Sequence, residues 1–315
     1  MSVVRDQVEA YIAYKNGLGV PMVSEASAMR QFVRYADSAG HEGPITVDIA
    51  VEWARSGTNH AEGYEIKRYE MARRVHEYAC ALAGAPSTLP PGLIGKSCNR
   101  ITPYIFTDEE ISLIMHAASK MYVQQDAMKP LAYAAVIGLL RATGMRPNEA
   151  LSLDDSDFDP DNGTFLVRKG KNNRERIIPV EESTVEAVMP YRGRRDELRD
   201  GVECRKLFVV NGDKSIRLGN LEHAFCEIRC VLLNRGEIWE RRPPRIYDMR
   251  HTFAVNKILS WHESGENVNA MLPVLATYMG HKNISETYWY LTGTPELLQV
   301  ACDTFEQAVK GVDAR

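Results

Sequence analysis

Apolar positions recur at helical spacing along the first 84 residues. Apolar residues three or four positions apart mark one face of an amphipathic helix. They do so around residues 8–12, 29–35 and 47–53, and again in a longer segment from Glu62 to Leu82. The pattern predicts three or four helices, and we assign residues 1–84 to a helical N-terminal domain.

A break in this pattern follows at residues 83–95. The segment combines small residues with several prolines and glycines, which interrupt helices and strands and are typical of linkers. We therefore predict a linker at residues 85–102 and a second domain at residues 103–315.

The second domain begins with a helix signal and contains one β signal. Thr107 and Glu110 have the spacing of a capping box. The apolar run Leu131–Leu140 is too short to span a bilayer and predicts a buried helix. Residues 164–168 and 176–180 are β-prone runs around a polar turn. Further helices are predicted at 221–233, 249–261 and 295–309. The fold class is mainly α with a small β-hairpin, in which a helical first domain precedes an α+β second domain.

Charge is unevenly distributed along the chain. A net charge of −4 argues mildly against a nucleic-acid-binding protein. Acidic residues, however, gather at 154–161 and basic residues at 168–176 and 241–250, so a locally basic face is compatible with this mean. In the helical segment 62–82, Lys67, Arg68, Arg73 and Arg74 could follow a phosphate backbone or form a solvated face.

Composition predicts a protein of a reducing compartment. The six cysteines are scattered without a Cys-x-x-Cys pair, and no zinc-ligand spacing is present. We expect reduced, mostly buried thiols, and neither metal nor cofactor. Arg5, Glu9 and Lys15 interrupt the N-terminus and disfavour a secretion signal. We expect a cytoplasmic protein that has no membrane partner.

Two segments of the second domain contain candidate phosphate ligands. In residues 142–151 a glycine ends one helix and Arg146 starts the next, where a cation and backbone donors could hold an anion together. Lys169 and Lys171 lie on the predicted hairpin turn and could reach a phosphate. Taken singly, these residues are better explained by an ordinary helix–helix turn and a solubilised strand edge.

Two further segments follow toward the C-terminus. Tyr247 and Arg250 are three positions apart and share one face of a helical turn. His281 follows a glycine and precedes an aromatic group that includes Tyr288 and Tyr290. Each of these segments is also compatible with a purely structural role.

Taken together and in this order, the four segments resemble the catalytic domain of the tyrosine recombinase family, which includes phage integrases, Xer-type resolvases and transposon recombinases. The resemblance covers roughly residues 103–305, and residues 288–298 look most like recombinases of transposon-like elements. Ala-Thr-Gly-Met-Arg146-Pro-Asn-Glu is similar to the first-arginine box, and Gly170-Lys171-Asn-Asn-Arg-Glu-Arg to the hairpin lysine segment. Tyr247-Asp-Met-Arg250 is similar to the His-x-x-Arg box, and Met-Gly-His281 to the Leu-Gly-His box.

The resemblance implies a role for each matched residue. Arg146 and Arg250 would clamp the scissile phosphate, with His281 and Tyr247 as further donors, and Lys171 rather than Lys169 would be the general acid. The family's nucleophilic tyrosine lies nine residues after the histidine, which favours Tyr290 over its neighbour Tyr288. Its attack would give a 3′-phosphotyrosyl bond, and rejoining would need neither metal nor ATP.

Tyr247 departs from the family pattern, which has histidine at this position. A tyrosine can donate a hydrogen bond to phosphate, but its pKa near 10 makes it a poor base at neutral pH. Either the chemistry tolerates this change, or His251 or His281 takes over more of the role.

The resemblance also implies partners. The expected partner is double-stranded DNA at specific recombination sites, bound by a homotetramer on two synapsed sites. Residues 295–309 would dock on a neighbouring subunit or pack on their own domain. The first domain resembles the family's core-binding domain in general character only. Two alternatives stay open: a type IB topoisomerase, and a DNA-binding accessory protein that acts beside sister recombinases.

Overall fold

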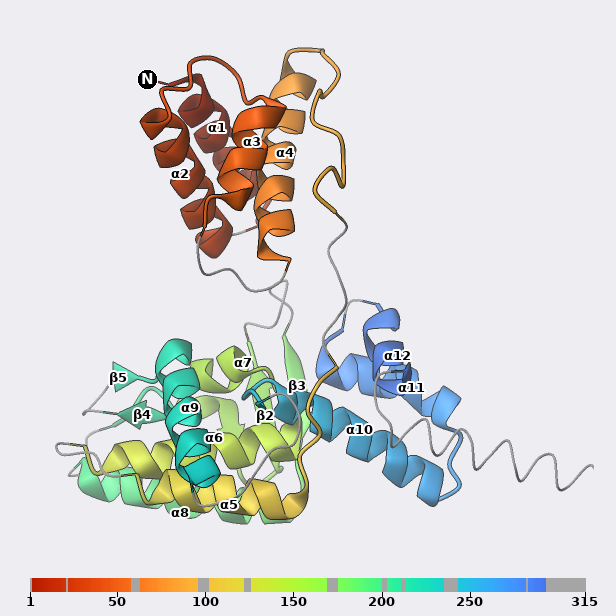
Figure 1. The fold of residues 1–315 in the computed structure, drawn as a ribbon. Helices are drawn as coiled ribbons and strands as arrows, with labels where there is room; N and C mark the ends of the chain where they lie inside the picture. Colours follow the sequence, from red (N-terminus) through yellow and green to blue (C-terminus); the bar gives the residue numbers. More distant parts are fainter. Residues whose placement is uncertain are drawn as a thin grey trace, which may run out of the picture. The chain divides into compact units, whose positions relative to one another are not determined.

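The computed structural model describes residues 2–20, 22–57, 63–95, 102–121, 126–168, 175–199, 203–210, 214–234, 243–281 and 283–292. The chain forms two compact units, residues 1–101 and 102–315. Both are dominated by helices (Figure 1), in agreement with the predicted fold class.

The first unit is a bundle of helices, as the sequence predicted. Its helices are α1 (Val3–Gly17), α2 (Val23–Ser38), α3 (Val47–Arg55) and α4 (Tyr64–Leu82). The core of the bundle includes the fully buried side chains of Trp53, Phe32 and Tyr69. The rings of Phe32 and Trp53 lie 4.8 Å apart, so α2 and α3 are joined by aromatic packing.

The chain does not leave this unit where α4 ends. Leu89 is 2% exposed and belongs to the core of the bundle. Tyr69 donates a hydrogen bond from Oη to the carbonyl oxygen of Pro90 at 2.8 Å, and His76 Nε2 lies 3.0 Å from Thr88 Oγ1. Residues 85–95, which the sequence predicted as part of a linker, therefore pack against the first unit, because they include an apolar side chain that the bundle buries.

The four basic residues of α4 have different environments. Arg68 is 7% exposed and its guanidinium lies 4.3 Å from the ring centroid of Trp53, which is a cation–π contact inside the unit. Arg73 pairs with Glu70 at 2.8 Å and with Glu77 at 3.0 Å. Lys67 and Arg74 are exposed. The interpretation of all four as phosphate ligands is therefore wrong for Arg68 and leaves Arg73 neutralised.

The second unit contains most of the chain's elements. Its helices are α5 (Asp108–Ser119), α6 (Met128–Thr143), α7 (Pro147–Ser152), α8 (Glu182–Leu198), α9 (Leu218–Asn234), α10 (Asp248–Glu263), α11 (Val268–Met279) and α12 (Ser285–Thr292), with a 3-10 turn, η1 (Asp155–Asp157). The predicted capping box is confirmed, since Thr107 Oγ1 accepts from the Glu110 backbone and Glu110 Oε2 from the Thr107 backbone.

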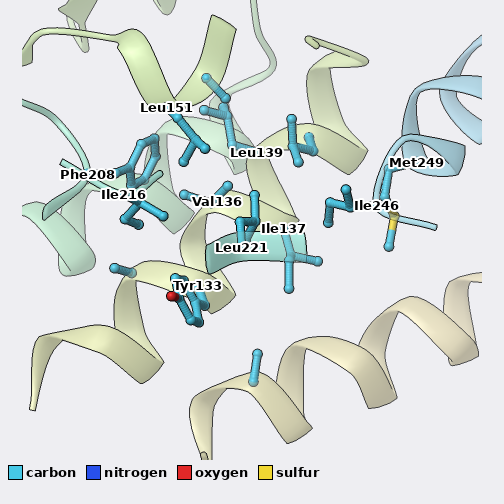
Figure 2. Close-up of a cluster of buried hydrophobic side chains, with 14 of the residues drawn as sticks. Tyr133, Val136, Ile137, Leu139, Leu151, Phe208, Ile216, Leu221, Ile246 and Met249 are labelled. Atoms are coloured by element: carbon cyan, nitrogen blue, oxygen red, sulfur yellow. The ribbon is translucent and has the colours of Figure 1, made fainter. Parts of the chain in front are cut away.

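The predicted apolar helix forms the centre of this unit. Tyr133, Val136, Ile137 and Leu139 of α6 meet Leu151, Phe208, Ile216 and Leu221 in one cluster (Figure 2). Ile246 and Met249, which lie just before and at the start of α10, join the same cluster. The core thereby fixes the C-terminal end of α6 relative to the first turn of α10, and both are important for the site below.

The predicted hairpin is part of a three-stranded antiparallel sheet in the order β1-β2-β3. The strands are β1 (Phe158–Asp159), β2 (Thr164–Val167) and β3 (Arg176–Pro179), with Val167 opposite Arg176. A second pair, β4 (Val209–Val210) and β5 (Lys214–Ser215), was not predicted because its strands are too short for a detectable alternation. Helix α8 was also missed, since it is rich in charged residues and contains Pro190.

The thiols differ partly from the expectation. Of the cysteines in the described part of the chain, all are free, Cys204 is buried and Cys80 is half-buried. Cys226 and Cys230 are exposed on α9, so the prediction that the thiols are mostly buried is wrong for these two. Within the described ranges, no helix is long and apolar enough to cross a membrane.

Candidate active site

Arg146 lies in the turn between α6 and α7. Gly144 ends α6 with a φ of +60°, a left-handed conformation that favours glycine, and Pro147 starts α7. Arg146 donates from Nη1 to Glu149 Oε1 at 2.8 Å and from Nη2 to the carbonyl oxygen of Gly280 at 3.2 Å. The first predicted arginine therefore contacts the turn that precedes His281, although the two are far apart in sequence.

Arg250 lies on the first turn of α10 and is 6% exposed. It donates from Nη1 to the carbonyl oxygen of Gly144 at 2.8 Å and from Nη2 to that of Met279 at 2.6 Å. The same Nη2 lies 3.0 Å from His281 Nε2. The structure thus brings together the three segments that contain Arg146, Arg250 and His281.

The common feature of these contacts is the C-terminal end of a helix. The last carbonyl groups of a helix have no partner within it and have partial negative charge, which favours cations. Helices α6 and α11 both end at a glycine with positive φ, Gly144 and Gly280. Carbonyl oxygens at these two ends accept from the arginines, which orders the guanidinium groups without neutralising them.

A third arginine, which the sequence analysis did not assign, completes the arrangement. Arg176 at the start of β3 donates from Nη1 and Nη2 to the two carboxylate oxygens of Glu149 at 3.1 and 2.7 Å, and from Nε to the Tyr278 carbonyl oxygen at 3.0 Å. We call Arg146, Arg176, Arg250 and Glu149 the arginine cluster. The guanidinium groups of Arg146 and Arg176 contact the one carboxylate, and Arg250 adds a third positive charge, so positive charge is in excess.

Glu149 is the negatively charged centre of this cluster. Its side chain is 3% exposed, and it also accepts from the backbone N–H of Arg146 at 3.0 Å. Burial by itself would raise the pKa of Glu149, but the hydrogen bonds and charge of Arg176, together with Arg146, lower it to about 2. The carboxylate is therefore ionised throughout the neutral range.

His281 connects Arg250 to the helix that contains Tyr290. Its Nδ1 lies 2.7 Å from Oγ1 of Thr287, a fully buried residue of α12. A guanidinium can only donate, so the contact between Arg250 and Nε2 requires Nε2 to accept and the proton to be on Nδ1. In this arrangement His281 is neutral and anchors the start of α12.

Tyr247 precedes α10 directly and is half-buried. Burial raises the pKa of Tyr247 above its ordinary value, the Glu222 carboxylate raises it further, and the nearby Arg146 lowers it in part. Tyr247 therefore keeps its proton at neutral pH and can act as a hydrogen-bond donor beside Arg146, but not as a base.

His251 behaves differently from His281. Burial lowers the pKa of His251 to about 4, with Asp248 opposing the shift and Arg245 and Arg250 adding to it. The ring of His251 is therefore neutral at pH 7.

Of the two remaining predicted residues, Tyr290 is described in its backbone only and Lys171 is not described. The backbone of Tyr290 belongs to α12, three positions after Thr287, and its side chain lies outside the described part. Tyr288 is 43% exposed on the same helix. Lys171, like Lys169, lies outside the described residues, between the ends of β2 and β3. Residues 295–309 also lie outside them.

Three residues of the site were missed by the sequence analysis: Glu149, Arg176 and Thr287. A signal existed for Glu149, because it stands three residues after Arg146, at the position where a helix accepts from its own N-terminus. Arg176 and Thr287 act through groups that are distant or unremarkable in sequence. Among the described residues, no group of three or more His, Cys, Asp or Glu side chains is arranged to hold a metal ion.

Comparison with known families gives one extended match. The family model described as Phage integrase family matches residues 105–296. This range extends from the capping box of α5 to α12 and contains Arg146, Arg176, Arg250 and His281.

Similar proteins are known over nearly the whole length. "Putative integrase/recombinase y4rE" of Sinorhizobium fredii is 31% identical over 95% of this chain and 94% of its own. "Tyrosine recombinase XerD" of Rhizobium meliloti is 26% identical over 90% of this chain and 91% of its own.

Solved structures agree in fold. The Tn1549 transposon integrase, solved with circular intermediate DNA, has a TM-score of 0.69 at 17% identity, covering 96% of this chain and 99% of that chain. The XerH site-specific recombinase, bound to palindromic difH substrate, has a TM-score of 0.64 at 19% identity over 92% of this chain and 80% of that chain. At this identity the likeness concerns the fold alone.

Proposed function

The chain belongs to the phage integrase family, and from this premise we propose that it cuts and rejoins DNA strands with Tyr290 as the nucleophile. It is a recombinase by family, and the family acts in site-specific recombination. The proposal extends this statement to catalytic activity and to named residues of this chain.

The observation that carries the proposal is the arginine cluster. A phosphodiester under attack gains charge on its non-bridging oxygens, and ordered guanidinium groups stabilise that charge in the transition state. Arg146 and Arg250 come from segments more than a hundred residues apart, and both are held by carbonyl oxygens at helix ends. We assign them to the scissile phosphate, with Tyr247 as a further donor.

The chemical step is a phosphoryl transfer. The Tyr290 oxygen attacks phosphorus, the bond from phosphorus to the 5′-oxygen breaks, and a 3′-phosphotyrosyl bond forms. We assign to Lys171 the proton that the 5′-oxygen takes up. A free 5′-hydroxyl of the partner strand reverses the reaction, so the energy of the phosphodiester is conserved and neither ATP nor a metal is needed.

His281 is assigned a positioning role and the role of proton acceptor for Tyr290. Its Nε2 is an acceptor in the geometry described, and Thr287 joins it to the tyrosine's helix. When a phosphate takes over the Arg250 donors, Nε2 becomes available for the phenolic proton. Tyr247 keeps its proton and leaves this role to the histidine.

We propose double-stranded DNA at specific sites as the partner, in the cytoplasm. A homotetramer on two synapsed sites would exchange strands in pairs, with residues 295–309 docked on a neighbouring subunit. Removing residues 293–315 would then leave DNA binding intact and abolish the tetramer on DNA. Mass photometry of the DNA complex distinguishes this from a segment that packs on its own domain, whose removal would leave the assembly unchanged.

The test of the activity is covalent capture. Nicked suicide duplexes tiled across the DNA that borders the gene are incubated with the protein in EDTA, and adducts are resolved on a denaturing gel. We expect an adduct with wild type and Tyr288→Phe, and none with Tyr290→Phe. Tight binding without an adduct would favour the accessory protein, which the intact arginine cluster disfavours. Relaxation of supercoiled plasmid without sequence preference would favour the topoisomerase.

A further inference from the structure

Arg176 is placed to act on Arg146 without itself contacting DNA. Three of its five N–H donors are used within the protein, two on Glu149 and one on the Tyr278 carbonyl oxygen. Its side chain is only 13% exposed. Both Nη atoms of Arg176 pair with a carboxylate, whereas the acceptors of Arg250 are uncharged, so Arg176 is directed toward Glu149 and not toward a phosphate.

The contact between Arg176 and Glu149 determines the environment of Arg146. The same two carboxylate oxygens accept from Arg146, through Nη1 at 2.8 Å and through its backbone N–H at 3.0 Å. Both arginines thus share a single negative charge. If Glu149 faced Arg146 alone, the two would form a neutral buried pair, and the attraction of Arg146 for a phosphate would fall.

A second contact places Arg176 against the turn before His281. A Cβ atom on Gly280 would lie 3.1–3.3 Å from the guanidinium atoms of Arg176, so the glycine backbone packs directly on this group. Gly280 is also the residue whose carbonyl oxygen accepts from Arg146. Arg176 therefore supports both acceptors of the Arg146 side chain, the Glu149 carboxylate and the Gly280 carbonyl.

We propose that Arg176 is a positioning residue for cleavage: by sharing Glu149 and supporting the Gly280 turn, it keeps Arg146 oriented and positively charged toward the scissile phosphate. This inference rests on the proposed function. It concerns the stabilisation of phosphate charge and not the departure of the 5′-oxygen, although β3 follows the segment that contains Lys171.

The experiment uses single-turnover cleavage by the full chain on two suicide duplexes. One has the normal scissile phosphodiester, and the other has sulfur in place of the bridging 5′-oxygen. A thiolate leaves without a proton, so the sulfur duplex bypasses the general acid and rescues Lys171→Ala. It does not bypass the arginines that stabilise the phosphate.

We expect Arg176→Gln to cleave about 10–100-fold more slowly on both duplexes, as for a small displacement of a catalytic group. Arg176→Lys, which keeps the charge, should stay within about tenfold of wild type. The double variant Arg176→Gln/Glu149→Gln restores the charge excess of the cluster and should recover about tenfold over Arg176→Gln. If Arg176 had only a structural role, the double variant would cleave more slowly than Arg176→Gln.

The matched control is Arg168→Gln at the other arm of the hairpin. Arg168 pairs from Nε with Asp157 Oδ1 at 2.5 Å, its side chain is 50% exposed, and Asp157 belongs to η1 and not to the cluster. This variant should stay within about threefold of wild type, since the Arg168 side chain is half exposed and the buried Asp157 keeps the Asp154 backbone N–H as a donor. Circular dichroism and a gel shift on the same duplex confirm folding and binding, and Arg176→Lys decides the case if Arg176→Gln is unfolded.

The outcomes separate the two proposals. No adduct with wild type on either duplex would overturn the proposed function and this inference with it. Wild-type cleavage with Arg176→Gln equally fast would overturn the inference alone. If Arg176→Gln cleaved the sulfur duplex as fast as wild type, Arg176 would instead assist the departure of the 5′-oxygen. Failure of the double variant to recover would overturn the role in charge sharing.

Discussion

In the first unit Arg73 is neutralised by two carboxylates of its own helix, whereas in the second unit Arg146 and Arg176 share one carboxylate and Arg250 is held by carbonyl oxygens. Both arrangements order the guanidinium group. Only the second keeps its charge available, because a carbonyl dipole attracts a cation without cancelling it. The acceptor, and not the arginine, decides whether the side chain stabilises a fold or can bind an anion.

The strongest way to break this comparison is to shorten one arginine in each unit. Arg250→Lys keeps the charge but loses the planar set of donors to Gly144 and Met279. We expect adduct formation to fall by about 10²–10³-fold, the usual loss when a donor to the reacting centre is removed. Arg73→Lys should cleave within about threefold of wild type. Equal losses of adduct in both variants would mean that an arginine held by carbonyl oxygens is no better placed to stabilise a phosphate than one paired with carboxylates.

A second comparison neutralises one carboxylate in each unit. Glu149→Gln removes the charge at the centre of the cluster and should lower the free energy of unfolding by about 3 kcal/mol, as for a broken buried ion pair. Glu70→Gln, whose Arg73 partner keeps Glu77, should cost less than about 1 kcal/mol. Calorimetry, which can resolve the unfolding of the two units, measures the loss of free energy of unfolding in each variant. A small loss for Glu149→Gln would contradict the shared-carboxylate arrangement.

A third comparison uses glycines with positive φ at helix ends. Gly84, just after α4, has open space around it, so Gly84→Ala should cost about 1 kcal/mol from backbone strain alone. At Gly144 a Cβ would lie 2.5 Å from Cδ1 of Phe253, so Gly144→Ala should cost about 1–3 kcal/mol more and displace Arg250's acceptor. Urea unfolding and adduct yield are the readouts. An equal cost at both glycines would show that Phe253 moves aside freely.

The pH dependence of stability gives a smaller effect. The folded pKa of His251 is about 4, below the 6.5 of the exposed side chain, so between these values the unfolded chain takes up a proton that the native chain does not. The contribution of His251 to the free energy of unfolding is fully present above pH 6.5 and is lost as the pH falls toward 4. The gap in melting temperature between wild type and His251→Gln should therefore narrow from pH 7 to pH 5. A constant gap would contradict the shifted pKa.

The smallest effect is expected for the exposed basic residues of α4. If Lys67 and Arg74 contact phosphates, each substitution to glutamine should reduce the salt dependence of DNA binding by about one counterion. Arg68→Gln has no such effect, because this side chain already packs on Trp53. Binding isotherms at several salt concentrations give the slope. An unchanged slope in Lys67→Gln would place the DNA on another face of the first unit.

Local signals explain what could be predicted. The capping box at Thr107, the buried helix 131–140 and the two β-prone runs depend on neighbours in sequence, and the structure has all of them. The order of the four segments predicted Arg146, Arg250 and His281 as site residues; in the structure Arg250 contacts His281, and Arg146 contacts Gly280 next to it. The polarity of α4 could not show which basic residues have partners, since those partners, Trp53 and Glu70, depend on packing and rotamer.

Long-range contacts explain the rest. Arg176 lies 27 residues from Glu149 and 102 residues from the Tyr278 carbonyl, and a backbone carbonyl gives no sequence signal at all. Thr287 supports His281 from the next helix, where a threonine is unremarkable. Helix α8 was missed because tertiary packing of Val188 and Tyr191 overrides its polar composition and Pro190.

The use of helix ends as acceptors has a consequence for the chain during its synthesis. Arg250 finds one acceptor at Gly144, already made, and two at Met279 and His281, which are translated about thirty residues later. The Gly280 carbonyl oxygen that accepts from Arg146 is translated 134 positions after it. A nascent or truncated chain that stops before α11 has all three arginines of the cluster and Glu149, but it lacks the carbonyl acceptors at Tyr278, Met279 and Gly280. For the proposed function, this means that the phosphate site can be ordered only after α11 has been synthesised.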